Sequence, residues 1–412
     1  AGFSFYIYSP IASSFLPPVD WEHPASIEGF IRLITRAQYG TFRASYGTGN
    51  SFLLRILNVL ALFQYMVKDF GIILLLFGCI GIGVLWKKGI TLWKIILLPF
   101  ALYIFYFFYA GFPTSGDFAL GTVERFMIAP YVFLVVCIAV GYEKIVENIE
   151  SIWEKKSTLV PVWCISLMLT LLFLLIPIKN IRSHYANMVY LSQDRTVERL
   201  GMDILRILPQ DAMVSLSSDT GGFSAYYAYY VLGYRPDVEL IWYAFVSRPY
   251  YQTYIRNTYP DVIFPKKELS SVEYLKEFLR LNGEKFPVFD EVSQPYQPGY
   301  WVPFGMIVKY YKDTSALPTK DEGISQNRIF WNTTYNPLSG ALSNYRHMLL
   351  SDVARYYAAK RLIFGDYLSL YDENELAYSE YKKTLSYDPT NGNAYSSLLK
   401  LEVSMHLCVP AS

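Results

Sequence analysis

Charged residues are scarce in this sequence. Lys, Arg, Asp and Glu make up 17% of the 412 residues, whereas hydrophobic residues make up 53%. Ordinary soluble domains carry about 25% charged residues, so the composition favours a membrane protein. The formal net charge is only +1 and the basic residues form no stripe along the chain. Such a chain has no field that would gather nucleic acid, and we exclude nucleic acid as a partner.

Cysteine and histidine are also rare, with four of each. Cys79, Cys137 and Cys164 fall inside apolar runs, and Cys408 stands alone in a polar region. The polar half of the chain therefore has no pair of cysteines for an internal disulfide. The histidines are far apart and follow no zinc spacing, so we expect no metal site.

A signal peptide is missing as well. The sequence opens at Ala1 with a stretch, residues 1–8, that is similar to the end of a longer hydrophobic segment. It has neither the basic region nor the cleavage site of a signal peptide, so targeting depends on upstream sequence or on internal segments. We expect the chain to be an N-terminally truncated part of a longer protein.

Long apolar runs are abundant. A helix of about 20 apolar residues crosses the hydrocarbon core of a bilayer. Runs of this kind occupy residues 70–86, 92–112, 126–142 and 158–178, which predicts four transmembrane helices. Before them, residues 51–70 alternate apolar and polar residues at helical spacing. This pattern indicates an amphipathic helix on the membrane surface.

Lysines in the short loops predict the orientation. Cytoplasmic loops collect Lys and Arg. Lysines stand at 87–88 and 155–156, in the first and third connections, whereas the loop 113–124 has no basic residue. The half of the chain after about Lys179 is therefore predicted on the non-cytoplasmic side. The expected location is the bacterial inner or plasma membrane, or the endoplasmic-reticulum membrane in a eukaryote.

The pattern changes after residue 178. Residues 212–243 read as strand, glycine-containing turn, helix and strand, the order of a βαβ unit. With a further strand at 305–312, they predict a small extracytoplasmic α/β domain after a polytopic helical membrane domain. The predicted domains are an outer loop with the amphipathic helix (1–69), the transmembrane helices (70–178), the α/β domain (179–319) and a helical region (320–412).

Two motifs in the polar half have alternative interpretations. The turn Ser218–Gly222 could hold a phosphate at a helix N-terminus. Because it has neither a Walker lysine nor a G-x-G-x-x-G motif, a plain strand-to-helix turn with Asp219 or Thr220 as N-cap is the better interpretation. Further on, Gly365, Ala377, Tyr381 and Pro389 fall on the small, aromatic and proline positions of a tetratricopeptide repeat of about 34 residues. Such repeats bind peptides on a concave face. The alternative is a helical hairpin that only packs against the α/β domain.

Candidate site residues lie in the outer N-terminal segment. Its prolines exclude a continuous helix and fix a loop that holds Asp20 and Trp21. One interpretation of the loop is a substrate site, with Asp20 as a base or metal ligand, Trp21 stacking on a sugar and Arg36 holding a lipid phosphate. The loop also suits a structural role, with Trp21 as an interfacial anchor and Asp20 or Ser26 as a helix cap. Glu124 and Arg125 in the second outer loop form either part of a site or a salt-bridged helix start.

The order of several motifs points to a family. The strings Tyr8–Pro10, Pro18–Trp21 and Arg36–Gly40, followed by Glu124–Phe126 and Gly233–Val238, resemble the signature of a bacterial membrane-protein family of formerly unknown function. That family is similar to the eukaryotic endoplasmic-reticulum protein O-mannosyltransferases of the GT-C glycosyltransferase superfamily. The resemblance covers nearly the whole chain.

The resemblance implies transfer of a sugar, expected to be mannose, from a polyprenyl-phosphate donor to Ser or Thr of an exported protein. Membrane lipid, the lipid-linked donor and the acceptor protein are the implied partners, and no further cofactor is expected. Arg36 and Arg125 become candidates for phosphate contacts, and Trp21, Gln38 and Tyr39 for further substrate contacts. The soluble half would recognise the acceptor.

The chain also departs from the family. The family usually has Asn at the position of Asp20, and Gly followed by Asp or Asn at Glu22 and His23. Asp20 and Glu124 are therefore weak catalytic candidates. The principal acid of GT-C enzymes follows their first transmembrane helix and is expected upstream of this chain, which leaves the catalytic residue unknown. A membrane-anchored scaffold for extracytoplasmic partners is the alternative function, and a transporter is disfavoured because no span carries a buried charge.

Overall fold

The structure is a computed structural model, and it describes residues 6–37, 52–87, 91–110, 121, 123–155, 161–266, 269–294, 299–339 and 348–405. The chain divides into two compact units. The first unit comprises Ala1–Phe30 and Gln193–Ser412, and the second comprises Ile31–Ser192. Residues 1–30 thus group with the polar half of the chain, whereas the sequence analysis assigned them to the membrane domain together with the rest of residues 1–69.

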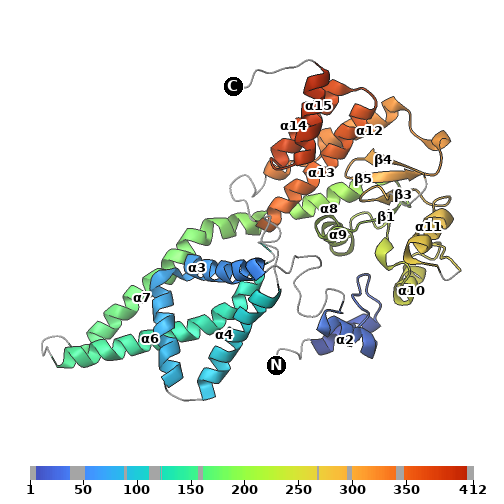
Figure 1. Ribbon diagram of the computed structural model, residues 1–412. Coiled ribbons are helices and arrows are strands. Elements are labelled where there is room, and N and C mark those ends of the chain that lie inside the picture. Colours follow the sequence, from blue (N-terminus) through green and yellow to red (C-terminus); the bar gives the residue numbers. More distant parts are fainter. Residues whose placement is uncertain are drawn as a thin grey trace. The chain divides into compact units, whose positions relative to one another are not determined.

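The second unit is helical throughout its described part (Figure 1). Its main helices are α3 (Phe52–Lys87), α4 (Thr91–Ala110), α6 (Ile128–Glu154) and α7 (Val162–Gln193), and the 3-10 turn η3 (Arg125–Met127) precedes α6. Among the described residues, three helices are long and apolar enough to cross a membrane. They are α3, α6 and the helical run that begins at Trp163 in α7. The apolar part of α4, Lys94–Tyr109, is shorter.

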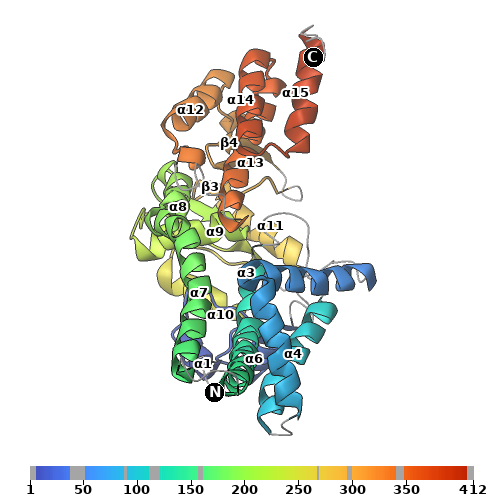
Figure 2. The ribbon, with the colours of Figure 1, turned by 90° about the vertical axis from the view of Figure 1, so that its left-hand side faces the viewer.

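Helix α3 is bent at Gly71, as Figure 2 shows. Gly71 has φ 73° and ψ 163°, outside the helical region, and glycine adopts a positive φ without a steric penalty. The bend separates an arm that ends at Phe70 from an arm that contains the most apolar part of the helix. It falls where the sequence analysis places the junction between the amphipathic helix and the first span.

Small residues bring α3 and α6 together. A Cβ on Gly81 would lie 1.8 Å from the carbonyl oxygen of Cys137, and a Cβ on Gly141 would lie 1.8 Å from that of Phe77. The two backbones are therefore in contact, a packing that membrane helices use when small residues face each other. Around this contact the buried apolar core contains Leu62, Met66, Leu74, Phe107, Val123, Met127, Leu134 and Ile138.

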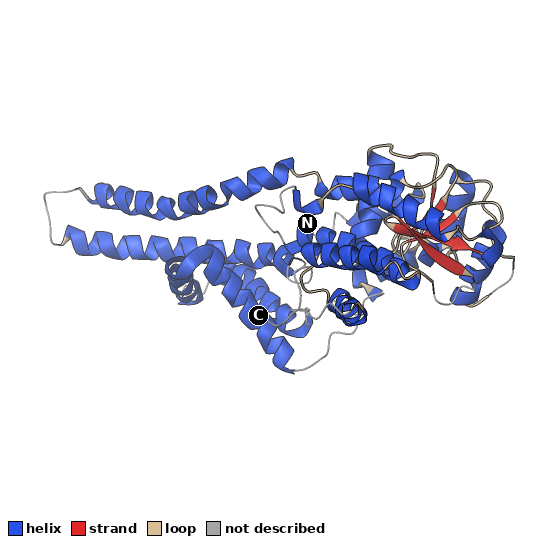
Figure 3. Cartoon of the chain, turned by 90° about the horizontal axis from the view of Figure 1, so that it is seen from above, coloured by secondary structure: helices blue, strands red, loops and turns tan. Residues whose placement is uncertain are grey.

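The first unit is built on a five-stranded sheet with the order β2-β1-β3-β5-β4. Its strands are red in Figure 3. The strands are β1 (Met213–Ser215), β2 (Glu239–Leu240), β3 (Val288–Asp290), β4 (Tyr300–Phe304) and β5 (Ile307–Tyr311). Strand β1 is parallel to β2 and β3, whereas β5 is antiparallel to β3 and β4. Strands β1, β2 and β5 lie inside the predicted strand segments, and β3 and β4 were not predicted.

The helices around this sheet are α8 (Thr196–Arg206), α9 (Asp219–Tyr226), α10 (Pro249–Thr258) and α11 (Ser271–Asn282). Helix α9 continues into the π-helical turn η4 (Tyr227–Val231). Gly201 allows α8 to touch α9, because a Cβ there would lie 2.1 Å from the carbonyl oxygen of Ser224. The core between helices and sheet includes the fully or almost fully buried Leu200, Ile204, Val214, Leu240, Phe278 and Phe289.

The C-terminal part of this unit consists of α12 (Lys320–Thr333), α13 (Met348–Leu370), α14 (Asn374–Tyr387) and α15 (Gly392–Ser404). Helices α13 and α14 pack closely where Gly365 meets Tyr381, since a Cβ on Gly365 would lie 2.7 Å from Cε1 of that ring. Ala377 and Tyr381 are buried. The tetratricopeptide assignment of these residues stays a prediction.

Candidate functional site

The carboxyl ends of the parallel strands are the natural place to look for a site in the first unit. Strand β1 pairs with β2 on one side and with β3 on the other. Open α/β sheets bind ligands at such a switch point, outside the carboxyl ends of the strands. Three segments leave the sheet there: the turn that begins α9, the loop from β2 to α10, and Asp290–Glu291 after β3.

Trp21 docks the N-terminal segment onto this edge. Its ring centroid lies 5.2 Å from those of Trp242 and Phe245, and it meets both rings edge-on, at 75° and 88°. Trp242 and Phe245 belong to the loop that follows β2. Close by, His23 stacks on Tyr250 at the start of α10, with ring centroids 4.7 Å apart and planes at 4°. The aromatic side chains of the N-terminal loop are thus partners of the α/β domain.

Asp20 links α1 to the loop that follows it through hydrogen bonds of its buried carboxylate. Its side chain is buried, and its Oδ2 accepts hydrogen bonds from Ser13 Oγ and from His23 Nδ1, both at 2.7 Å. Ser13 belongs to α1 (Tyr8–Ser14), and its Oγ also accepts from the backbone N–H of Ala25 at 3.2 Å. Asp20 does not cap α2 (Ile27–Thr35); Ser26 Oγ does, by accepting from Gly29 N at 3.0 Å.

Two consecutive residues of this loop have left-handed backbone. Glu22 has φ 60° and His23 has φ 48°, a conformation that costs an ordinary L-residue about 1 kcal/mol and suits Gly, Asn and Asp. Gly29 packs against the same turn, since its Cβ would lie 2.1 Å from the carbonyl oxygen of Glu22. Glu22 and His23 thus hold this loop in a strained backbone conformation.

The turn after β1 has its anion position filled by Glu291, which the sequence analysis missed. The buried carboxylate of Glu291 accepts from the backbone N–H groups of Ser217, at 2.8 Å, and Ser218, at 2.7 Å, and from the Ser218 hydroxyl. A bound phosphate would use the same N–H groups. Ser218 Oγ accepts from Gly221 N and caps α9, so the predicted caps, Asp219 or Thr220, are wrong.

Lys360 of α13 contacts Glu291 as well, and we call Glu291, its serine partners and Lys360 the Glu291 cluster. Its Nζ is buried and donates to the carbonyl oxygen of Glu291 at 2.5 Å. Burial lowers the pKa of Lys360 to about 8 and raises that of Asp290 to about 7. Burial also acts to raise the pKa of Glu291, but the Lys360 charge and the hydrogen bonds from the serines outweigh it and lower that pKa. The cluster fastens α13 to the sheet, because charges buried this deeply need partners.

The remaining predicted site residues belong to the second unit. Arg36 follows α2 with φ 51°, and Glu124 precedes η3. Arg125 is the first residue of η3, but its side chain lies outside the described residues, as do Gln38 and Tyr39. The structure therefore brings Asp20 and Trp21 together in the first unit and places Arg36, Glu124 and Arg125 in the other.

A polar cluster joins three helices of the second unit. Tyr131 OH donates to Oδ2 of Asp69, and Asn180 Nδ2 donates to the carbonyl oxygen of Asp69 at 3.0 Å. The bend of α3, the start of α6 and the middle of α7 thus meet at Asp69. Across the described ranges, no group of three or more His, Cys, Asp or Glu is arranged to hold a metal ion.

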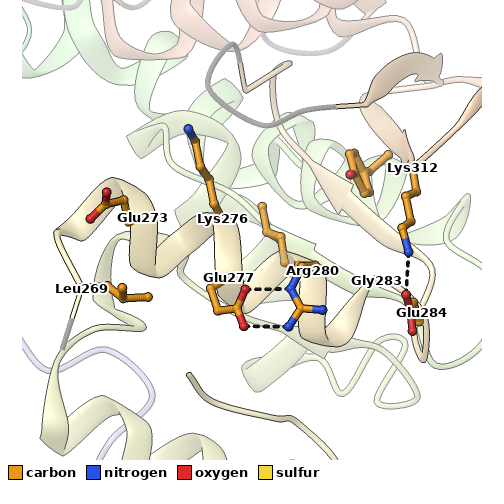
Figure 4. A pocket seen from close by; sticks show the side chains of 10 residues that line it. Leu269, Glu273, Lys276, Glu277, Arg280, Gly283, Glu284 and Lys312 are labelled. Carbon is orange, nitrogen blue, oxygen red and sulfur yellow. Dashed lines mark hydrogen bonds and ion pairs between the residues drawn. The ribbon is translucent and has the colours of Figure 1, made fainter. Parts of the chain in front are cut away.

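A surface cavity of about 580 Å³ lies at the other end of the parallel strands, between α11 and the end of β5 (Figure 4). Two ion pairs join charged side chains of its lining. Arg280 Nη2 lies 2.7 Å from Oε1 of Glu277, and Lys312 Nζ lies 2.6 Å from Oε1 of Glu284. Because these charges compensate each other, this cavity is not our candidate site.

Comparison with known proteins gives a distant relationship. The chain is 22% identical over 304 residues to the protein O-mannosyl-transferase TMEM260 of Mus musculus, covering 69% of this chain and 41% of that protein. It is 22% identical over 289 residues to the protein O-mannosyl-transferase tmem260 of Dictyostelium discoideum, covering 65% of this chain and 35% of the relative.

The chain spans less than half the length of these two relatives. No family model matches it, and no solved structure matches it. The distant relatives are named protein O-mannosyl-transferases, and the apolar helices of the described residues indicate a membrane protein.

Proposed function

We propose that this chain is part of a GT-C membrane glycosyltransferase that moves mannose from a polyprenyl phosphate to Ser or Thr of exported proteins. The observation that carries the proposal is the similarity to proteins named protein O-mannosyl-transferases, which extends over 69% of the chain in one case. The apolar helices supply the second support, because a polyprenyl-linked donor is accessible only from the membrane.

The proposed reaction needs one proton acceptor and one anion site. The acceptor hydroxyl oxygen attacks the anomeric carbon, the bond from that carbon to the phosphate oxygen breaks, and a carboxylate takes the hydroxyl proton. The polyprenyl phosphate leaves with the bonding electron pair, and basic side chains stabilise its charge. We assign the phosphate contacts to Arg36 and Arg125. We assign no residue as the principal carboxylate.

Other roles follow from the described contacts. The carboxylate of Asp20 is buried beneath Ser13 and His23, which suits positioning of the loop better than proton transfer. Trp21 and Tyr39 stay our candidates for the sugar, and Trp21 is partly enclosed by Trp242 and Phe245. Gln38 stays a candidate for a further substrate contact. Glu124 is the alternative carboxylate.

The arrangement in the membrane belongs to the same proposal. Helix α4 serves as a fourth span beside α3, α6 and α7, and the unit that starts at Gln193 lies on the non-cytoplasmic side. There the α/β domain and the helices α13 to α15, as a tetratricopeptide-like region, recognise the acceptor protein.

The test uses the complete open reading frame expressed in membranes. Radiolabelled polyprenyl-phosphate mannose and a fraction of exported proteins are added, and protein-bound label is counted. We expect label that depends on the lipid-linked donor. Arg36→Ala and Arg125→Ala should lose transfer, and the Lys variants should retain part of it because the charge remains. Full transfer by both Ala variants would remove the phosphate assignments, and no transfer from any polyprenyl-linked sugar would favour the scaffold function.

A further inference from the structure

An uncharged aromatic helix lies on the surface of the first unit. Residues 220–234 contain no Asp, Glu, Lys or Arg, and they form most of α9, the turn η4 and the residues that follow. Several large side chains on this helix are exposed at helical spacing: Phe223 (45%), Tyr227 (42%), Tyr230 (38%) and Val231 (65%). A helix of a soluble surface would carry charges at such positions.

A second uncharged segment belongs to the same unit. Residues 1–19 contain no charged side chain, and α1 with its flanking residues exposes Ile7, Tyr8, Ile11 and Phe15. Ring contacts link the two segments, because Trp21 meets Trp242 and Trp242 meets Phe223, with centroids 5.2 and 6.1 Å apart. We call the exposed side chains of these two segments the aromatic face.

Exposed charges of this unit gather on other elements. Helix α11 exposes Glu273 and Arg280, and α12 exposes Asp321 and Arg328. The aromatic face is therefore a local feature and does not reflect a general shortage of charge in the unit. Exposed apolar surface of this kind marks a binding surface for protein or membrane.

Covalent continuity identifies the membrane as the occupant. The larger segment of the first unit begins at Gln193, the last residue of α7, and α7 contains one of the helices that can cross a membrane. The N-terminal segment is tethered too, because α2 continues from Phe30 into the second unit. The unit that carries this face is therefore covalently linked to the membrane on both sides of the second unit. Tyrosine and tryptophan prefer the bilayer interface, where the ring is in apolar surroundings and the polar group reaches water.

We propose that the aromatic face lies in the headgroup region of the membrane that anchors the chain. The rings of Phe223 and Tyr227 and the side chain of Val231 then enter the boundary between headgroups and acyl chains, to a depth of about 5 to 10 Å. This contact holds the α/β domain at the bilayer surface, and it does not depend on the proposed transferase activity.

Site-directed fluorescence quenching tests the contact in the whole chain. The protein is reconstituted into phosphatidylcholine nanodiscs after Cys79, Cys137, Cys164 and Cys408 have been replaced by Ala. An environment-sensitive fluorophore is then attached at Val231→Cys. We expect loss of its fluorescence when lipids carry a nitroxide near the headgroup, a smaller loss with a nitroxide near the end of the acyl chain, and little effect of a water-soluble nitroxide.

Val272→Cys is the matched control. Val272 is also an exposed valine on a helix of the same unit, 48% accessible, but it lies beside Glu273 on α11. Its label should respond only to the water-soluble nitroxide. The proposal is overturned if the two labels respond alike. It is also overturned if the label at 231 is shielded from both lipid-borne and soluble nitroxides, which would identify a protein partner or a second copy. Circular dichroism confirms that each variant is folded.

Discussion

Trp21 meets Trp242 edge-on, with ring centroids 5.2 Å apart and planes at 75°. The two residues are far apart in the sequence, and their contact makes the proline-rich N-terminal loop part of the carboxyl edge of the α/β sheet. The conformation of that loop therefore depends on the folded state of the α/β domain.

Replacing Trp21 by Ala tests this coupling. The substitution removes the ring that contacts Trp242 and Phe245, and we expect the free energy of unfolding of the first unit to fall by about 1 to 3 kcal/mol, less than for a fully buried Trp. Hydrogen exchange of residues 13–25 should rise more than that of α14. Trp21→Phe is the control and should keep most of the protection. Unchanged exchange in Trp21→Ala would show that the loop is held by other contacts.

Gly29→Ala should destabilise the loop although alanine is the better helix former. A Cβ on Gly29 would lie 2.1 Å from the carbonyl oxygen of Glu22 and 2.3 Å from that of His23. The gain of about 1 kcal/mol in helix propensity is smaller than the cost of moving this backbone, so we expect a net loss of roughly 2 kcal/mol. Gly392→Ala in α15 should not destabilise the protein, because a Cβ at that position would meet no neighbouring residue within 4 Å. Chemical denaturation of both variants decides the matter; equal stabilities would contradict the packing described.

Glu239 predicts a pH dependence of stability. Burial, with a smaller effect of the Asp261 charge, raises the pKa of this carboxyl to about 7. The folded protein then binds the proton more tightly than the unfolded chain, so this group lowers the free energy of unfolding as pH rises from about 4.5 to about 7. Because the side chain is partly exposed, we expect Glu239→Gln to stabilise the protein at pH 8 by only about 1 to 2 kcal/mol.

Thermal melts of this variant and the parent at pH 8 and pH 4 measure that difference. The stabilisation should vanish at pH 4, where the parent carboxyl is protonated in both states. A gain that persists unchanged at pH 4 would mean that the substitution acts through packing and not through the charge.

Lys360→Met should weaken the attachment of α13 to the sheet. The ammonium group donates to the carbonyl oxygen of Glu291 and balances its carboxylate, and removing one partner of a buried pair costs about 3 to 5 kcal/mol. Lys382→Met is the matched control, because that lysine is exposed on α14 and should change stability by less than about 0.5 kcal/mol. Urea denaturation that ranks the two variants equally would contradict this account of the cluster.

Local patterns in the sequence predicted much of the fold. Apolar runs gave the helices of the second unit, and the βαβ pattern gave β1, α9 and β2. Strand β3 is only three residues long, Val288–Asp290, too short for an alternating pattern. Strand β4 contains Pro303, and a proline argues against a strand at the level of sequence. Both strands are held by their neighbours in the sheet, which no local pattern reveals.

Less of the candidate site could be predicted from the sequence. The loop geometry around Asp20 was expected from its prolines, but its partners Ser13 and His23 were not. Glu291 and Asp69 were missed because their roles depend on Ser218 and Tyr131, which are distant in the chain and come close only in the folded protein. Whether Arg36, Gln38, Tyr39 and Arg125 bind substrate stays a prediction.

The chemistry of the transferred label tests the central claim most directly. The complete protein in membranes is supplied with polyprenyl-phosphate mannose or, separately, with a nucleotide-linked mannose, and the labelled acceptor is treated with alkaline borohydride. The account predicts label only from the lipid-linked donor, released as mannitol because the sugar is bound to Ser or Thr oxygen. Label that comes only from the nucleotide sugar, or that resists alkaline release, would contradict it.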